Sequence, residues 1–260
     1  MSMTVSDTAL TRLVGIARAA GDAIMPHYTP AVSADRKEDG SPITAADRAA
    51  HRAIIDALAD WDPDIPIVSE EGRIPPYEER ASWRQFWLVD PLDGTKEFIK
   101  RNGEFTVNIA LIEDGVPILG VVHAPALGVT WAAGRGLGAW KHVPGASPTR
   151  LASSPKKTGE PLIVVESRSH PSAELEAFLQ TIPVERRVQA GSALKFCLVA
   201  EGAADIYPRF GPTMEWDSAA GDCVFRASGR DGERTSPLEY NTRDLKNPPF
   251  VMGFEGRRPV

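Results

Sequence analysis

The stretch FWLVDPLDGTKEF, residues 86–98, begins as an apolar strand and turns acidic within a few residues. Four apolar residues, 86–89, precede Asp90 and Asp93. The end of a buried strand is where α/β folds display functional side chains, because the strand fixes their positions. Carboxylates are hard oxygen ligands that suit Mg²⁺, Mn²⁺ or Ca²⁺. The pair therefore indicates a metal site, although a turn aspartate beside a helix cap explains it about equally well.

Gly94 and Thr95 follow the two aspartates and suggest a second function for this strand end, which is phosphate binding. Glycine lets the backbone approach a ligand closely, and Thr95 can open a short helix. Backbone N–H groups at the start of such a turn bind phosphate oxygens. The stretch thus combines potential metal ligands with potential phosphate donors.

Three further acidic segments carry weak signals of their own. Glu70 and Glu71 end the preceding apolar strand, which alone indicates only a solvated strand end. Asp217 lies in MEWDSAAGD, where it resembles a helix N-cap, and Asp47 stands at capping-box spacing from a threonine. A carboxylate at a helix start can still present an oxygen to a metal. Together these residues predict an acidic cluster for two or three divalent ions.

Composition limits the classes of function that the chain can serve. The 260 residues carry a net charge of −6, which argues against a nucleic-acid polymer as partner. Two cysteines, Cys197 and Cys223, form no CxxC pair, and the N-terminus lacks a signal-peptide pattern, so a cytoplasmic setting is the simplest expectation. No apolar run approaches the ~18 residues that span a bilayer. Peripheral membrane association and oligomeric state stay open.

The order of predicted elements changes along the chain. Residues 1–150 read as an α+β lobe with two helices and several mostly antiparallel strands, and contain the EEG and DPLDGT segments. Residues 151–260 alternate strand and helix, as in an α/β lobe, and contain the GSALK and EWDSAAGD segments. Turn formers and charges at 146–161 indicate the boundary.

Three motifs, EEG at 70–72, WLVDPLDGTKEF at 87–98 and EWDSAAGD at 215–222, resemble the signatures of the inositol monophosphatase superfamily. Its members are Mg²⁺-dependent, lithium-sensitive phosphatases. Within it, the segment 191–222, with its lysine and its YPRFGPT run, is similar to the bacterial CysQ-type 3′(2′),5′-bisphosphate nucleotidases. The resemblance implies the layered αβαβα sandwich of the sugar phosphatases.

The resemblance also implies a role for each matching residue. Two Mg²⁺ ions are expected, with a third, weaker ion near Glu71, and Li⁺ is expected to inhibit. The first ion would be held by Glu71, Asp90 and the carbonyl of Leu92, and the second by Asp90, Asp93 and Asp217. Thr95, supported by Asp47 and together with Glu71, would position the attacking water. The substrate-binding set would be Glu71, Leu92, Asp93, Gly94, Thr95, Ser192, Lys195, Arg209 and Asp217, with Gly94 and Thr95 on the scissile phosphate.

The expected reaction is hydrolysis of the 3′-phosphate of adenosine 3′,5′-bisphosphate to AMP and phosphate. Its sulfated analogue, 3′-phosphoadenylyl sulfate, is a second expected substrate, which would connect the enzyme to sulfur metabolism. The partner is thus a small phosphorylated nucleotide. The expected location is the cytoplasm, with attachment to the cytoplasmic face of the inner membrane left open.

Three other functions compete with this one. An inositol or other sugar monophosphatase would use the same metals, and the cations Lys195 and Arg209 argue for a second phosphate instead. A haloacid-dehalogenase phosphatase needs two aspartates separated by one residue, whereas two residues separate Asp90 from Asp93. A non-enzymatic metal- or nucleotide-binding module would be favoured by an incomplete acidic set.

Overall fold

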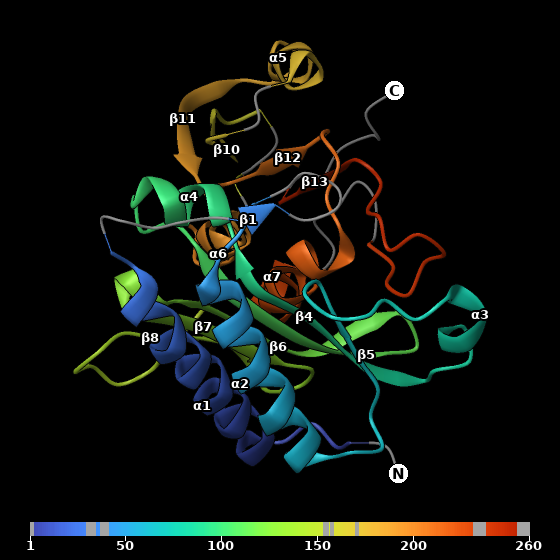
Figure 1. The fold of residues 1–260 in the computed structure, drawn as a ribbon. Helices are drawn as coiled ribbons and strands as arrows, with labels where there is room; N and C mark the ends of the chain where they lie inside the picture. Colours follow the sequence, from blue (N-terminus) through green and yellow to red (C-terminus); the bar gives the residue numbers. More distant parts are fainter. Residues whose placement is uncertain are drawn as a thin grey trace.

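The computed structural model describes residues 3–29, 35–36, 42–152, 156, 159–169, 172–230 and 238–253. Within these ranges, helices and sheets alternate in five layers (Figure 1). A helix pair, a seven-stranded sheet, a second helix pair, a smaller sheet and one outer helix follow each other. This arrangement confirms the predicted αβαβα sandwich.

The central sheet has the strand order β3-β4-β5-β6-β7-β8-β9. β3 pairs in parallel with β4, and every later pair in the sheet is antiparallel. The apolar run of the opening stretch forms the buried part of β4, beside the edge strand β3. The strands are β3 (Ile67–Ser69), β4 (Gln85–Asp93), β5 (Thr106–Glu113), β6 (Val116–Ala124), β7 (Val129–Gly134), β8 (Gly138–His142) and β9 (Thr149–Arg150).

The helices α1 (Asp7–Ile24) and α2 (Ala45–Trp61) cover one face of this sheet. Each is amphipathic, and each begins at a hydroxyl cap that accepts from a backbone N–H of the first turn: Ser6 for α1 and Thr44 for α2. In α2 the cap is completed by Asp47, as the sequence spacing predicts. The start of α2 thereby becomes a fixed point near the end of β4 (Figure 1).

The helices α6 (Leu194–Ala200) and α7 (Glu215–Phe225) cover the opposite face. Helix α7 lies tightly against β6 because residue 120 is glycine. A Cβ at Gly120 would stand 2.6 Å from Cys223 Cβ and 3.1 Å from the carbonyl oxygen of Ala220. This close packing fixes the height of α7 above the sheet and therefore the position of its first turn.

The smaller layer is built from two strand pairs joined by a bridge. The parallel pair is β10 (Leu162–Ser167) with β11 (Val184–Ala190), and the antiparallel pair is β12 (Tyr207–Arg209) with β13 (Phe250–Met252). A bridge between Val164 and Ile206 joins them. Helix α5 (Ala173–Leu179) packs outside this layer on a separate apolar cluster.

The predicted lobe boundary at 150/151 stays a prediction. It falls between β9 of the large sheet and β10 of the small one. The apolar core, however, runs across it, since one cluster joins Leu88 and Ala110 of the sheet to Cys197 and Val224 of the second half. The two halves of the chain therefore share a core.

Short elements connect these layers. They are η1 (Met25–His27), β1 (Asp35–Arg36), β2 (Pro42–Ile43), α3 (Tyr77–Arg80), α4 (Thr95–Lys100), η2 (Pro125–Leu127) and η3 (Arg226–Arg230). Among the helices of the described ranges, none has the length and apolarity needed to cross a bilayer.

Candidate active site

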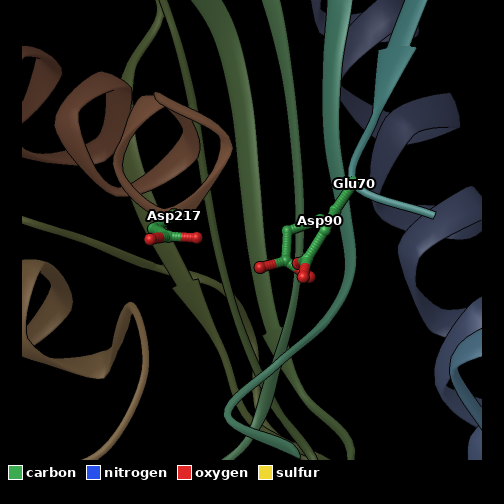
Figure 2. Close-up of side chains that lie close together, drawn as sticks. All are labelled: Glu70, Asp90 and Asp217. Atoms are coloured by element: carbon green, nitrogen blue, oxygen red, sulfur yellow. The ribbon is translucent and has the colours of Figure 1, made fainter. Parts of the chain in front are cut away.

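Three carboxylates from distant parts of the sequence meet between the large sheet and α7. Glu70 follows β3, Asp90 lies in β4, and Asp217 stands in the first turn of α7. One carboxylate oxygen of each lies within 4.8 Å of one oxygen of each other residue. Figure 2 shows Asp217 facing Glu70 and Asp90 across the gap between helix and strand. The predicted convergence of acidic segments is therefore observed.

The parallel pairing of β3 with β4 brings the first two carboxylates together. Ser69 pairs with Val89, and the N–H of Glu70 donates to the carbonyl of Val89 at 3.1 Å. Ser69 and Val89 are opposite each other, and Glu70 and Asp90 are the residues that directly follow them. Their side chains lie near each other because adjacent strands are only ~4.8 Å apart.

Asp217 reaches the cluster from the start of α7. Its Oδ2 accepts the backbone N–H of Met214 at 2.9 Å, so Asp217 is an N3 residue of this helix rather than its N-cap. One oxygen thereby restrains the side chain while the carboxylate still meets Asp90 and Glu70. Capping and a ligand role are compatible here.

Burial and mutual repulsion shift the acid–base equilibria of this cluster. Burial, followed by the charges of Glu70, Asp93 and Asp217, raises the pKa of Asp90 well above its usual value. Burial and then the charge of Asp93 raise the pKa of Asp217 in the same way. Ionised carboxylates held together in a buried place need a compensating cation. The donor set, with oxygen ligands alone, fits hard divalent ions such as Mg²⁺.

The sequence prediction of Glu71 as a metal ligand needs revision. Among the described residues, the carboxylates that meet are those of Glu70, Asp90 and Asp217. Glu70, and not Glu71, also lines the adjoining cavity, and after burial its charge is among the causes that raise the pKa of Asp93 and Asp217. Glu70 and Glu71 occupy a turn after β3, in which the N–H of Gly72 donates to the carbonyl of Ser69 at 3.0 Å, and it is the Glu70 carboxylate that meets Asp90 and Asp217.

Asp93 lies beside the three carboxylates rather than among them. Its Oδ2 accepts from Asn108 Nδ2 at 3.2 Å. Burial raises the pKa of Asp93 to about 6, although the positive charge of Lys195 and the Asn108 amide oppose the shift. A β-bulge between Asp90 and Asp93 turns the chain at this point, and Asp90 Oδ1 accepts the N–H of Leu92 at 3.0 Å. The Leu92 side chain packs into the core.

Thr95 and Asp47 form the predicted pair. Thr95 Oγ1 donates to Asp47 Oδ1 at 3.4 Å, while Asp47 Oδ2 accepts from the N–H and the hydroxyl of Thr44 at 2.7 and 2.6 Å. Gly94 precedes Thr95 with φ 91°, a left-handed conformation that glycine adopts without strain. A Cβ at this position would also collide with Ser192 Oγ.

A cavity of about 330 Å³ adjoins the carboxylates, and its wall contains the predicted substrate residues except Glu71 and Leu92. Lys195 projects from α6, and burial lowers its pKa to about 8, with the charge of Asp93 opposing. Arg209, at the end of β12, donates through Nη2 to the carbonyl of Pro212 at 2.9 Å. Its buried Nε has no hydrogen-bond partner in the described part of the chain. Both cations therefore border the cavity.

Ser192 also borders the cavity, but its hydroxyl is engaged with the backbone. Ser192 Oγ lies 2.8 Å from the carbonyl oxygen of Asp93 and 2.7 Å from that of Glu104. These contacts join the loop before α6 to the end of β4. The geometry favours a structural role for this side chain over the predicted nucleotide contact.

The sequence reasoning missed one residue of this site, Asn108. It counted Glu70 in the acidic cluster but gave the role of metal ligand to its neighbour Glu71. Asn108 left a visible signal, because it is the amide inside the mostly apolar run FTVNIALI, residues 105–112. A buried amide in a strand interior indicates a specific hydrogen-bond partner.

The sequence of the chain matches a known protein family. The family model described as "Inositol monophosphatase family" matches residues 6–249. The chain belongs to the inositol monophosphatase family. The three segments that resembled the family's signatures are those that supply the acidic cluster.

Two curated relatives of this family member carry the name 3′(2′),5′-bisphosphate nucleotidase CysQ. The protein of Escherichia coli O157:H7 is 51% identical over 250 residues, covering 94% of this chain and 99% of the relative. The protein of Salmonella typhimurium is 50% identical over 246 residues, covering 93% and 98%. The resemblance drawn from the sequence is thus confirmed.

Solved structures of the family agree with the fold. CysQ from Bacteroides thetaiotaomicron has a TM-score of 0.79 at 40% identity, covering 95% of this chain and 98% of its own. An inositol monophosphatase from Thermotoga maritima has a TM-score of 0.76 at 27% identity, covering 95% and 92%. Membership in this family excludes a haloacid-dehalogenase fold.

Proposed function

We propose that the protein is a Mg²⁺-dependent 3′(2′),5′-bisphosphate nucleotidase. It hydrolyses the 3′-phosphate of adenosine 3′,5′-bisphosphate to AMP and phosphate, and acts likewise on 3′-phosphoadenylyl sulfate. The observation that carries the proposal is the meeting of three carboxylates beside a cavity bordered by two cations, Lys195 and Arg209. The names of relatives at about half identity support the same substrate class.

In this proposal the acidic residues hold two Mg²⁺ ions. Glu70, Asp90 and the carbonyl of Leu92 are the ligands of the first ion, and Asp90, Asp93 and Asp217 those of the second. A third, weaker ion is assigned near Glu70, since this residue replaces Glu71 in each predicted role. The ions would neutralise the phosphate charge and lower the pKa of water, whose bulk value is ~15.7.

The remaining residues bind and orient the reactants. Gly94 and Thr95 contact the scissile phosphate through their N–H groups. The Thr95 hydroxyl, hydrogen-bonded to Asp47, orients the attacking water together with Glu70. Because phosphoryl transfer needs little covalent help from a protein, such positioning and charge stabilisation supply most of the rate. Lys195 and Arg209 contact the second phosphate, and Ser192 keeps its loop in place.

Within the same family, an inositol monophosphatase is the second candidate. The structural likeness to the Thermotoga maritima inositol monophosphatase supports this candidate. The metal cluster alone does not distinguish between the two substrates. A second phosphate on the substrate distinguishes the two functions, since an inositol monophosphate gives Lys195 and Arg209 no second anion to bind.

A phosphate-release panel tests the proposal directly. Purified protein is assayed with Mg²⁺ and either adenosine 3′,5′-bisphosphate, 3′-phosphoadenylyl sulfate or inositol 1-phosphate, each with and without Li⁺. We expect the bisphosphate to be turned over with the highest kcat/KM, and Li⁺ to inhibit. Faster turnover of inositol 1-phosphate would assign the second function. Tight binding without phosphate release would indicate a binding module instead.

The proposed role places the enzyme in the cytoplasm, where it would remove a by-product of sulfate assimilation. Fractionation of cells that express the protein tests the location, and recovery with the inner membrane would show peripheral attachment.

A further inference from the structure

Two polar side chains on β5 lie beneath the acidic cluster. In the β4–β5 ladder, Asn108 is paired with Asp90 and Thr106 with Asp93. Both polar residues are fully buried. Further along this strand face stand Ala110 and Ile112, which belong to the apolar core. The strand is therefore polar on this face only beside the two aspartates.

Asn108 is half satisfied in its hydrogen bonding. Its Nδ2 donates to Asp93 Oδ2 at 3.2 Å, while its buried Oδ1 has no partner within the described residues. A buried amide with an unpaired oxygen is unfavourable compared with an apolar side chain of equal size. Core packing alone therefore gives no reason for asparagine at this position, and the bond to Asp93 does.

An amide is suited to hold a metal ligand. The other groups that favour the ionised form of Asp93 come from the loop before α6 and from α6 itself: the N–H of Ala193 and the charge of Lys195. The Lys195 ammonium compensates the charge of Asp93, whereas an amide fixes its orientation and leaves the negative charge for a cation. Asn108 also stands on a central strand, which is more rigid than a loop.

We infer that Asn108 is a positioning residue, which fixes the Asp93 carboxylate in the orientation that binds the divalent cation. The inference rests on the proposed function only in taking Asp93 as a ligand. A residue that orients a metal ligand through a hydrogen bond governs metal affinity without touching substrate. Asn108 would thus set the Mg²⁺ requirement of the enzyme and leave substrate binding alone.

The test compares Asn108→Leu, which removes the donor at similar size, with the control Thr106→Val. Thr106 lies on the same face, and its buried Oγ1 forms no hydrogen bond among the described residues. The first readout is the Mg²⁺ concentration at half-saturation of the substrate-free protein, measured by isothermal titration calorimetry with Mg²⁺ alone. The second is the Mg²⁺ dependence of phosphate release from adenosine 3′,5′-bisphosphate.

In Asn108→Leu, both midpoints should rise about 10- to 100-fold. The substrate KM at saturating Mg²⁺ should stay close to the wild-type value, and Thr106→Val should keep the wild-type midpoints. If Asn108→Leu does not fold, Asn108→Ser, whose hydroxyl is too short to reach Asp93, is compared in the same way.

An unchanged Mg²⁺ midpoint in the calorimetric titration, in whichever Asn108 variant folds, would overturn the inference. A lower melting temperature with an unchanged Mg²⁺ midpoint would likewise show a purely structural role. Failure of the proposed function looks different: the wild type would release no phosphate from the bisphosphate, while the substrate-free Mg²⁺ midpoints of the variants could still be compared.

Discussion

Replacing Asp93 by asparagine should nearly abolish activity and yet stabilise the metal-free protein. Burial raises the pKa of Asp93 from 3.8 to about 6, which at pH 7 corresponds to about 3 kcal/mol against the folded state. This figure is an upper limit, because Asp93 is partly exposed and Lys195 loses its compensating charge in the variant. We expect a net gain of about 1–2 kcal/mol in the free energy of unfolding.

The pH dependence of this gain has a definite sign. The folded protein holds the Asp93 proton more tightly than the unfolded chain, so the wild type loses stability as the pH rises from about 4 through about 6. The advantage of asparagine should therefore fall to about one third at pH 4.5. It should vanish below the unfolded-state pKa, where the carboxylate is protonated in both states.

Urea unfolding in EDTA at pH 7 and pH 4.5, followed by circular dichroism, measures both effects. Phosphate release in Mg²⁺ should be at least about 100-fold slower than in the wild type, because a proposed metal ligand is lost. The exposed Asp64 provides the control, and Asp64→Asn should change neither stability nor activity. A variant that is less stable than the wild type in EDTA at pH 7, or a gain that does not depend on pH, would refute the reasoning.

Three further changes test the site residue by residue. Glu70→Gln should slow phosphate release by at least about 100-fold at saturating Mg²⁺, and Glu71→Gln should change it little, because the carboxylate that meets Asp90 and Asp217 is that of Glu70; equal losses would contradict this assignment. Thr95→Val should lower kcat by about 100-fold with little change in melting temperature, since the Asp47 cap of α2 stays intact; a large fall in melting temperature would mean that Thr95 is structural. Lys195→Met should reduce kcat/KM for the bisphosphate far more than for a simple monophosphate, and equal reductions would count against a second-phosphate site.

The opening stretch allowed much of the site to be predicted, because its chemistry is local in sequence. An apolar strand followed by two aspartates and Gly-Thr already combines rigidity, hard ligands and a tight turn. The capping box of α2 was predictable in the same way, since Thr44 and Asp47 interact within one helical turn. The five-layer fold followed from resemblance rather than from periodicity.

The choice between Glu70 and Glu71 could not be made from local pattern. Both residues follow the same strand, and both are acidic. The selection depends on the parallel pairing of Ser69 with Val89, which puts Glu70 beside Asp90. Strand register is a tertiary property, and a shift of one residue exchanges the two faces of a strand.

Ser192 illustrates a second limit of sequence reasoning. A serine near a lysine in a Gly-Ser loop is a reasonable ligand for a nucleotide. Its hydroxyl instead contacts two carbonyl groups, of Asp93 and Glu104, that lie 99 and 88 residues earlier in the chain. No local signal records such a distant partner. Hydrogen bonds between segments far apart in sequence become visible only in the fold.

The apolar core shared by the two halves of the chain explains how the fold tolerates repulsion among the carboxylates of the site. Asp217 belongs to the second half of the chain, whereas Glu70, Asp90 and Asp93 belong to the first. Without a cation, mutual repulsion would drive α7 away from β4. The close approach of α7 to Gly120 and the buried cluster between helix and sheet oppose that motion. Apolar packing, which does not depend on metal, therefore maintains the geometry that the cations need before they bind.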